Sequence, residues 1–293
     1  MIISTFFSTY TPLLLVSVGA LISEYAGVMA VFLEGILNLS AFLTLCFGII
    51  FHSSTVALLL SALVCALFIF IVAHFTERTG ANPFLTGLAV NLFVTGLISI
   101  LSSIFFNTRG VIAFTDFIET IPNEFFFVKN ISTSFGFFTV IIVLIALTWT
   151  KWGMRIKITG SDSDVLIRFG INPGKYRILS WVIPATMASI AGSLKAFKLG
   201  SFVPNISSGM GWIAIACVFL GHKKIRGVII ASIIFSLSEL LSIKLQGASF
   251  GMTIPPTIFL SVPYIIPIIM LALMPEKIFQ KRNLHKIEIK DNN

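Results

Sequence analysis

Long runs of apolar residues, separated by short polar stretches, fill the sequence. They cover residues 5–22, 35–51, 55–73, 84–105, 134–150, 179–196, 209–221, 227–244 and 255–274. Most of these runs hold the roughly 20 residues that an α-helix needs to cross the hydrocarbon core of a bilayer. Run 209–221 is shorter and predicts a half-helix. Because apolar and polar residues do not alternate with a period of two, we expect helices and not the strands of a barrel.

The predicted fold is an all-α polytopic membrane protein, a bundle of about 8–10 transmembrane helices with broken or re-entrant segments. Residues 1–276 are expected to form one transmembrane domain, and residues 277–293 a basic cytoplasmic tail. If residues 23–34 do not cross the membrane, an outer N-terminus precedes about nine crossings; if they do, an inner N-terminus precedes about ten. The sequence leaves both arrangements open.

Composition supports this class and excludes others. Of the 293 residues, 56% are hydrophobic and 11% are charged, whereas an ordinary globular domain carries about 25% charged residues. This excludes a soluble enzyme, a disordered chain and a disulfide scaffold. The three cysteines lie inside apolar runs without ligand spacing, so we expect neither a metal site nor catalytic residues.

The net charge of +8 is concentrated between the apolar runs. Residues 151–178 carry four more basic than acidic residues, and the turn at 223–226 and the C-terminal tail are also basic. Residues 106–133 carry one more acidic than basic residue. Because cytoplasmic loops collect Lys and Arg, the basic segments are predicted to be cytoplasmic and 106–133 external. The charge therefore indicates membrane topology and not nucleic-acid binding.

Two glutamates bracket a polar interruption near the start of the chain. Glu24 and Glu34 flank a stretch in which Gly27 and Gly35 weaken helical continuity. Acids at membrane depth usually serve a transport pathway, so the stretch predicts a broken or re-entrant segment buried in protein. An inner loop in water that joins two spans is equally compatible with the sequence.

Amide side chains and a second irregular segment extend this candidate path. Asn38 follows Glu34 by one helical turn, and Asn91 lies within a run, where a lone Asn more often joins helices than contacts a ligand. Residues 199–213 contain one Pro and three Gly, and they predict irregular backbone lining a cavity, or an outer connecting loop. The candidate substrate-path residues are Glu34, Asn38, Asn91, Asn205, Ser207 and Trp212.

Residues 160–171 predict a short amphipathic helix on the cytoplasmic side. Ser161 or Asp162 is the expected N-cap, apolar residues follow at helical spacing, and Gly170 and Pro173 end the helix. An exposed apolar face on such a helix favours docking into a groove on a partner, or contact with lipid. The spacing leaves both interpretations open.

Several stretches carry a resemblance to a known family. They are LISEYAGV (21–28) with LEG (33–35), ANP (81–83) with TGLAVNL (86–92), WGMR (152–155), GIN (170–172), PN (204–205), GWIA (211–214) and VFLG (218–221). In order and spacing the chain resembles the permease subunits of ATP-binding-cassette (ABC) importers for nucleosides and simple sugars, relatives of ribose and branched-chain amino-acid permeases. It looks most like the shorter of the two permeases that pair in nucleoside importers.

The resemblance implies that residues 160–171 are a coupling helix seated in a cleft of a cytoplasmic ATPase, and that segments 23–38 and 199–213 border the translocation path. The implied coupling-helix residues are Gly160, Ser161, Asp162, Asp164, Leu166, Phe169, Gly170 and Ile171. The implied cargo is a nucleoside, with purine nucleosides favoured, or a simple sugar. The implied location is the bacterial cytoplasmic membrane, surrounded by lipid, with a cytoplasmic C-terminus.

The resemblance also implies partners: a second permease in a heterodimer, an ABC ATPase that holds ATP and Mg²⁺, and an extracytoplasmic substrate-binding (lipo)protein. The chain itself lacks the GxxxxGK[ST] phosphate loop, so it is expected to need no cofactor and not to be an enzyme. The family usually has Arg at the position of Tyr25 and Asn-Ile-Gly at 30–32, where this chain has Ala-Val-Phe. These departures argue against a polar substrate contact at 30–32.

Two rival functions are weaker. An ion-coupled secondary transporter needs paired carboxylates in mid-membrane, whereas Glu24, Glu34 and Glu239 lie at the edges of apolar runs. An intramembrane enzyme needs a motif such as HExxH or GxSxG, which the sequence lacks.

Overall fold

The structure is a computed structural model that describes residues 2–114, 123–247, 265 and 269. The chain divides into two units, Met1–Ser236 and Leu237–Asn293, and each is considered by itself. In the second unit the described residues are helical: the last part of α10 and the single positions 265 and 269. The rest of the predicted run 255–274 and the predicted tail 277–293 lie outside the described residues.

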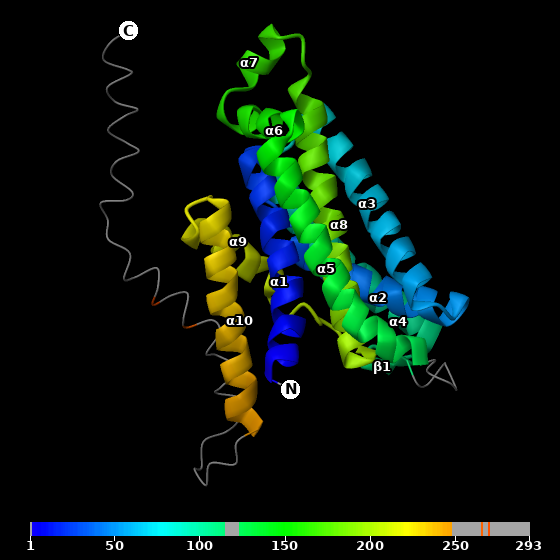
Figure 1. Cartoon of the computed structure of the whole chain (residues 1–293). Helices are drawn as coiled ribbons and strands as arrows, with labels where there is room; N and C mark the ends of the chain where they lie inside the picture. Colours follow the sequence, from blue (N-terminus) through cyan, green and yellow to red (C-terminus); the bar gives the residue numbers. More distant parts are fainter. Residues whose placement is uncertain (1, 115–122, 248–264, 266–268, 270–293) are drawn as a thin grey trace. The chain divides into compact units, whose positions relative to one another are not determined.

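Nearly all of the described elements are helices (Figure 1). They are α1 (Ile2–Tyr25), α2 (Leu33–Phe51), α3 (Ser54–Thr79), α4 (Pro83–Phe106), α5 (Asn123–Trp149), α6 (Lys151–Ser161), α7 (Ser163–Arg168), α8 (Pro173–Leu199), α9 (Met210–Leu220) and α10 (Ile225–Gly247). Two short strands, β1 (Ile112–Ala113) and β2 (Ser201–Phe202), pair antiparallel, which the sequence pattern did not predict.

The predicted all-α polytopic fold is confirmed. Among the described residues, six helices are long and apolar enough to span a bilayer, or seven if the pair α5–α6, bent by 71°, counts as one span. α9 has 11 residues, about half of a crossing, as its short apolar run predicts. The number of spans is lower than the predicted 8–10 because α9 is too short to count as a span, and because the count covers only the described residues.

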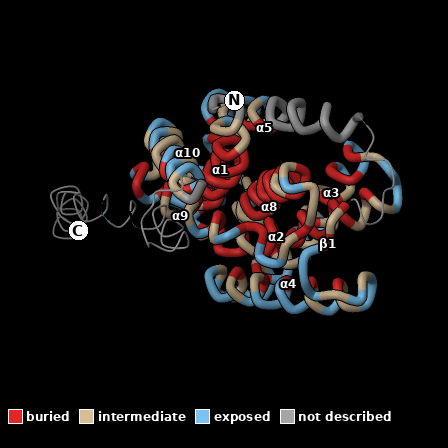
Figure 2. The backbone as a smooth tube through the Cα atoms, turned by 90° about the horizontal axis from the view of Figure 1, so that it is seen from below, coloured by how far each residue is buried: buried red, intermediate tan, exposed pale blue. Residues whose placement is uncertain are grey.

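Helices α1, α2 and α8 form the buried centre of the first unit, whereas α4 exposes one side (Figure 2). The exposed side chains of α4 are apolar, and Leu92 and Phe93 are examples. An apolar surface of this kind matches lipid tails and would not be stable in water. Helix α3 packs against α2 and α8 with its inner face and presents Leu63 and Leu67 outward.

Small residues and hydroxyls join the central helices at close range. Thr44 of α2, Ser61 of α3 and Ser193 of α8 are fully buried. The Thr44 and Ser193 hydroxyl oxygens lie 2.7 Å apart, and those of Ser61 and Ser193 lie 3.1 Å apart. Beside this cluster, Gly192 lets α8 touch the backbone of α2 at Leu37. Small residues with interhelical hydrogen bonds are the usual means of helix association in membranes, where burial of apolar surface gives little gain.

The connection from α1 to α2 bears on topology. The C-terminal end of α1 lies beside α6, so the start of α1 lies at the opposite end of this unit from α6 and α7 (Figure 1). Residues 26–32 turn irregularly between the two helices and form no crossing helix. This is the arrangement expected for the outer N-terminus, provided that basic segment 151–178 is cytoplasmic.

We predict that Gly192→Ala destabilises the bundle. A Cβ at residue 192 would lie 2.3 Å from the Leu37 carbonyl oxygen and 2.1 Å from the Ser40 hydroxyl. Overpacking of this kind costs about 1–3 kcal/mol. The measurement is thermal unfolding in detergent. Unfolding is monitored by the reaction of a fluorescent maleimide with the thiols of Cys65 and Cys217, which are buried in the folded protein.

The matched control is Gly96→Ala on α4, where a Cβ would meet nothing within 4 Å. This variant should unfold at the parent temperature. Equal midpoints for the residue 192 and residue 96 variants would contradict the close contact between α2 and α8.

Candidate functional site

The first turn of α9 is capped by a carboxylate from another helix. Gly209, at φ 79°, is the N-cap residue of α9 and supplies no side chain. Glu34, in the first turn of α2, accepts hydrogen bonds from Gly209 N–H (2.9 Å) and Gly211 N–H (2.7 Å). The same carboxylate accepts the hydroxyl proton of Ser207. It therefore satisfies amides that have no partner within α9 and places negative charge at the positive end of that helix.

The α2 and α9 backbones are in direct contact at this point. A Cβ at Gly211 would lie 2.6 Å from the Glu34 amide nitrogen. Only glycine fits there, so the N-termini of two helices converge on one carboxylate. Broken helices whose N-termini meet inside a bundle are a known arrangement at membrane solute sites.

The segment that leads into α9 is held by two further side chains. Asn38 accepts the Ser207 amide proton at 3.1 Å and donates to the Glu34 carbonyl at 3.1 Å. Lys195 of α8 donates to the carbonyls of Ile206 (3.3 Å) and Ser207 (3.1 Å). Of the predicted irregular segment 199–213, residues 203–209 are irregular, whereas Leu199 ends α8, residues 201–202 form β2 and residues 210–213 begin α9. Lys195 satisfies two carbonyls of the irregular part.

Lys195 was not among the predicted site residues. One sequence signal could have indicated this role. Lys195 lies near the end of an apolar run, just before a segment rich in Gly and Ser, whose irregular backbone leaves carbonyls in need of a hydrogen-bond donor.

The predicted path residues differ in how far protein groups bind them. Glu34, Asn38 and Ser207 form the network described above. Asn205 is exposed, adopts φ 58° and has its amide oxygen 3.3 Å from the Ser207 hydroxyl. Trp212, in the first turn of α9, is 46% exposed. It is therefore a large side chain beside this network that protein groups leave partly exposed.

The side-chain amide of Asn91 in α4 forms hydrogen bonds to the α1–α2 connection and to the start of α2 through both its nitrogen and its oxygen. It donates to the Val31 carbonyl and accepts the Gly35 amide proton, each at 2.8 Å. These two bonds hold the start of α2 beside Glu34. Asn91 thus joins helices in this structure, and its predicted contact with solute is untested.

The residues that depart from the family pattern also face protein. Ala30, Val31 and Phe32 are buried, and the Phe32 ring stacks on Trp181 with centroids 4.8 Å apart. Tyr25 receives the Lys157 ammonium 5.1 Å above its ring. Ala30, Val31 and Phe32 therefore pack in the core behind the site, whereas Tyr25 is half-buried.

The opposite end of α9 carries a second glutamate contact. Lys223, in the turn that follows α9, forms an ion pair with Glu24 near the end of α1. Both glutamates are therefore engaged with protein groups. The connection does join two spans without crossing, as one alternative predicted, but its expectation that both acids lie in water is wrong.

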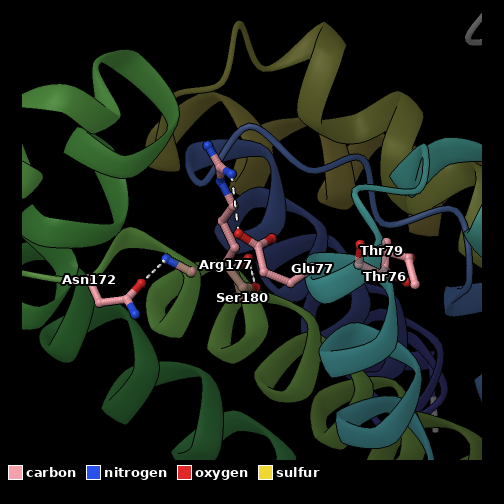
Figure 3. A network of polar contacts seen from close by, with 7 residues as sticks. Thr76, Glu77, Thr79, Asn172, Arg177 and Ser180 are labelled. Carbon is pink, nitrogen blue, oxygen red and sulfur yellow. Dashed lines mark hydrogen bonds and ion pairs between the residues drawn. The ribbon is translucent and has the colours of Figure 1, made fainter.

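A cavity of about 380 Å³ lies between residues 26–28 of the α1–α2 connection, α3, α6 and α8. Its wall includes the ion pair between Arg177 of α8 and Glu77 of α3, separated by 3.3 Å. Figure 3 shows this pair, with Asn172 nearby capping the start of α8 through the Gly174 amide. Across the residues that the structure describes, no group of three His, Cys, Asp or Glu side chains is placed to hold a metal ion.

The short helix predicted after Ser161 or Asp162 is α7 (Ser163–Arg168), which covers only part of the range 160–171 implied for the coupling helix. Gly160 and Ser161 belong to the end of α6, because helical hydrogen bonding continues to the Asp162 amide, which donates to Ile158 at 2.8 Å. Asp162, with extended backbone, separates the two helices and caps α7 by accepting the Asp164 amide proton at 3.1 Å. The prediction of Asp162 as N-cap is confirmed, and Ser161 is excluded.

α7 ends as predicted and is amphipathic. Gly170 adopts φ 71°, and the amide of Ile171 donates back to the Leu166 carbonyl at 2.9 Å. Leu166 is buried, whereas the side chain of Phe169 is 77% exposed and that of Ile167 is 58% exposed. The short helix therefore presents an apolar surface at the basic end of the unit.

A bundle of apolar spans, with an irregular connection between α1 and α2 and a half-helix capped inside it, is typical of a membrane permease. The family model described as "Branched-chain amino acid transport system / permease component" matches residues 2–274, and the chain belongs to this family.

Curated relatives are similar to the chain over most of its length. The nucleoside ABC transporter permease protein NupC of Lactococcus lactis is 28% identical, over 90% of this chain and 88% of its own. The guanosine ABC transporter permease protein NupQ of Bacillus subtilis is 27% identical, over 89% and 88%. A putative glucose ABC transporter permease protein, TsgC13 of Haloferax volcanii, is 24% identical, over 83% and 77%. No solved structure gives a significant match.

We predict that Asn91→Leu destabilises the site. The substitution keeps the side-chain volume but leaves the Val31 carbonyl and the Gly35 amide without their partner. An unsatisfied buried polar group costs about 1–3 kcal/mol. Thermal unfolding of the purified variant in detergent should show a lower midpoint.

Thr95→Val, one turn further along α4, is the control, because Thr95 is exposed and its hydroxyl bonds only to the Asn91 carbonyl of its own helix. Its midpoint should stay at the parent value. An unchanged midpoint for Asn91→Leu would mean that the amide does not hold the start of α2.

Proposed function

We propose that this chain is the membrane-spanning permease subunit of an ABC importer that carries nucleosides, with purine nucleosides favoured. The observation that carries the proposal is the convergence of the starts of α2 and α9 on the Glu34 carboxylate, within a chain of this permease family. The relatives named for nucleoside and guanosine transport support the choice of cargo.

In this proposal Trp212 and Asn205 contact the solute. The indole of Trp212 offers an aromatic face on which a nucleobase can stack. The Asn205 amide, in the segment that leads into α9, is also exposed. Glu34, Asn38, Ser207 and Asn91 shape the backbone of the path instead, since their polar atoms already bind protein groups. Few groups then remain for the solute, which suits a path that must release its cargo.

The energy comes from partners in this proposal. A separate ABC ATPase binds ATP and Mg²⁺ and docks on α7, whose exposed Phe169 and Ile167 fit an apolar groove. A second permease completes the path as a heterodimer, and an extracytoplasmic substrate-binding lipoprotein delivers the solute. The assembly lies in the bacterial cytoplasmic membrane with the C-terminus inside, and the permease has no ATPase site of its own.

A simple-sugar permease is the second candidate, supported by the relative named for glucose. A ribose-type cargo would need hydroxyl contacts in place of stacking. An ion-coupled transporter is less favoured, because Glu24 and Glu34 are each held by a fixed partner and a coupling carboxylate must exchange its ion.

We predict that Trp212→Ala lowers nucleoside uptake about tenfold, because one base–aromatic stack contributes about 1–3 kcal/mol. The measurement is uptake of labelled guanosine by proteoliposomes that hold the complete importer. Excess unlabelled adenosine should compete, whereas excess ribose should not.

Phe219→Ala is the matched control. Phe219 is an exposed aromatic residue seven positions along α9, hence on the same side of the helix two turns away from Glu34. It should retain most of the uptake. Competition by ribose with no effect of guanosine would reject the nucleoside and favour the sugar.

We predict that Phe169→Asp releases the ATPase while the permease still inserts. A carboxylate on the exposed face of α7 cannot enter an apolar groove without a large desolvation cost. The measurement is co-purification of the ATPase from solubilised membranes. Phe169→Leu keeps an apolar side chain and should retain the ATPase.

Normal co-purification with Phe169→Asp would contradict the assignment of α7 as the docking helix. Loss with both variants would indicate a requirement for the aromatic ring and not for apolar character.

A further inference from the structure

Helix α9 is held at both ends by the two glutamates that flank residues 26–32, named here the connector. At the N-terminus of α9, Glu34 accepts the Gly209 and Gly211 amide protons. At its C-terminal end, Glu24 of α1 pairs with Lys223 in the turn that follows α9. The two attachment points are separated by the length of the half-helix, about 16 Å.

The connector is joined to α6 by backbone contact. A Cβ at Gly160 would lie 2.2 Å from the Tyr25 carbonyl oxygen and 2.6 Å from the Gly27 amide nitrogen. No side chain stands between the two segments there, so a displacement of one is transmitted directly to the other. Gly160 lies two residues before Asp162, the break from which α7 begins.

The other side of this joint has room to move. The cavity of about 380 Å³ is bordered by Ala26, Gly27 and Val28 of the connector and by Thr159 and Gly160 of α6. The connector and the end of α6 are in close contact with each other, whereas the cavity beside them is not filled by side chains. The two segments can therefore shift together into this cavity.

We propose that the connector is a lever that carries movement of α6 and α7 to α9, with Glu24 and Glu34 as positioning residues. This inference rests on the proposed function in one respect, that α7 receives the ATPase. Because Glu24 at the end of α1 and Glu34 at the start of α2 hold α9 from the two ends of the connector, a displacement of the connector that moves these two helix ends changes the tilt of the whole half-helix and not only of one turn. The tilt moves Trp212 and the loop before it, and so opens or closes the path.

Ala216 provides a reporter of this tilt. It is partly exposed, and it lies between Trp212 and Phe219 on the outer side of α9. The test uses Ala216→Cys in a Cys46→Ser background, where the remaining thiols, Cys65 and Cys217, are buried. The rate of maleimide labelling of the complete importer is compared without nucleotide and with ATP plus vanadate.

With the lever intact, ATP plus vanadate should change the labelling rate several-fold. Gly160→Ala, which forces the joint apart, and Glu34→Gln, which cannot accept both α9 amides, should each abolish this change while the ATPase still co-purifies. Gly96→Ala, where a Cβ meets open space, should retain it.

A charge exchange between Lys223 and Glu24 distinguishes loss of their ion pair from misfolding of a variant. Lys223→Glu alone places two carboxylates together and should abolish the nucleotide response, and Glu24→Lys added to it should restore the response. A retained response in the Gly160 and Glu34 variants, no rescue by the charge exchange, or no response in the parent would each overturn the lever. Labelling needs no transported solute, so an error in the nucleoside assignment appears in uptake alone, and an error in docking appears in co-purification.

Discussion

The carboxylate of Glu34 at the start of α9 is the interaction on which the site depends. A helix that begins inside a bundle exposes amides that neither lipid nor its own turns can satisfy. Glu34 meets two of them, and Gly211 lets the two backbones come close enough for this to happen. Asn38, Lys195 and Asn91 then hold the segments that lead to the same point. Without this cap, the half-helix would have no stable position in the membrane.

Local patterns were sufficient to predict much of the fold. The apolar runs gave the spans, the short run gave the half-helix, and the glycines near Glu24 and Glu34 gave the break between α1 and α2. Asp162 was recognisable as a cap because its side chain acts only two residues away. These features are predictable because each depends on residues that are near one another in the chain.

Contacts between distant residues were not predictable. Glu34 and Gly211 are far apart in sequence, and neither residue type by itself indicates the other. The family resemblance places Gly160 in the coupling helix, whereas it lies in α6 and is a point of backbone contact with Tyr25 and Gly27. A glycine required for close approach looks in sequence like a glycine that flanks a helix, so this contact could not be predicted.

The division of labour among polar groups explains how such a permease can be both stable and weakly binding. Most amides and acids near the path are used to hold irregular backbone, and Phe32 on Trp181 fills the space behind them. In the proposed function, the exposed indole of Trp212 and the exposed amide of Asn205 remain for cargo. Under this proposal, transport depends on moving these groups, and not on tight recognition.

The most direct measurement is a pair of structures of the assembled importer, one without nucleotide and one trapped with ATP. The account predicts that α9 changes its tilt between the two states while the Glu34 carboxylate stays hydrogen-bonded to the Gly209 and Gly211 amides and Gly160 stays against the connector. An α9 that keeps its place while α6 and α7 move, or a Glu34 carboxylate that leaves the α9 amides, would contradict it.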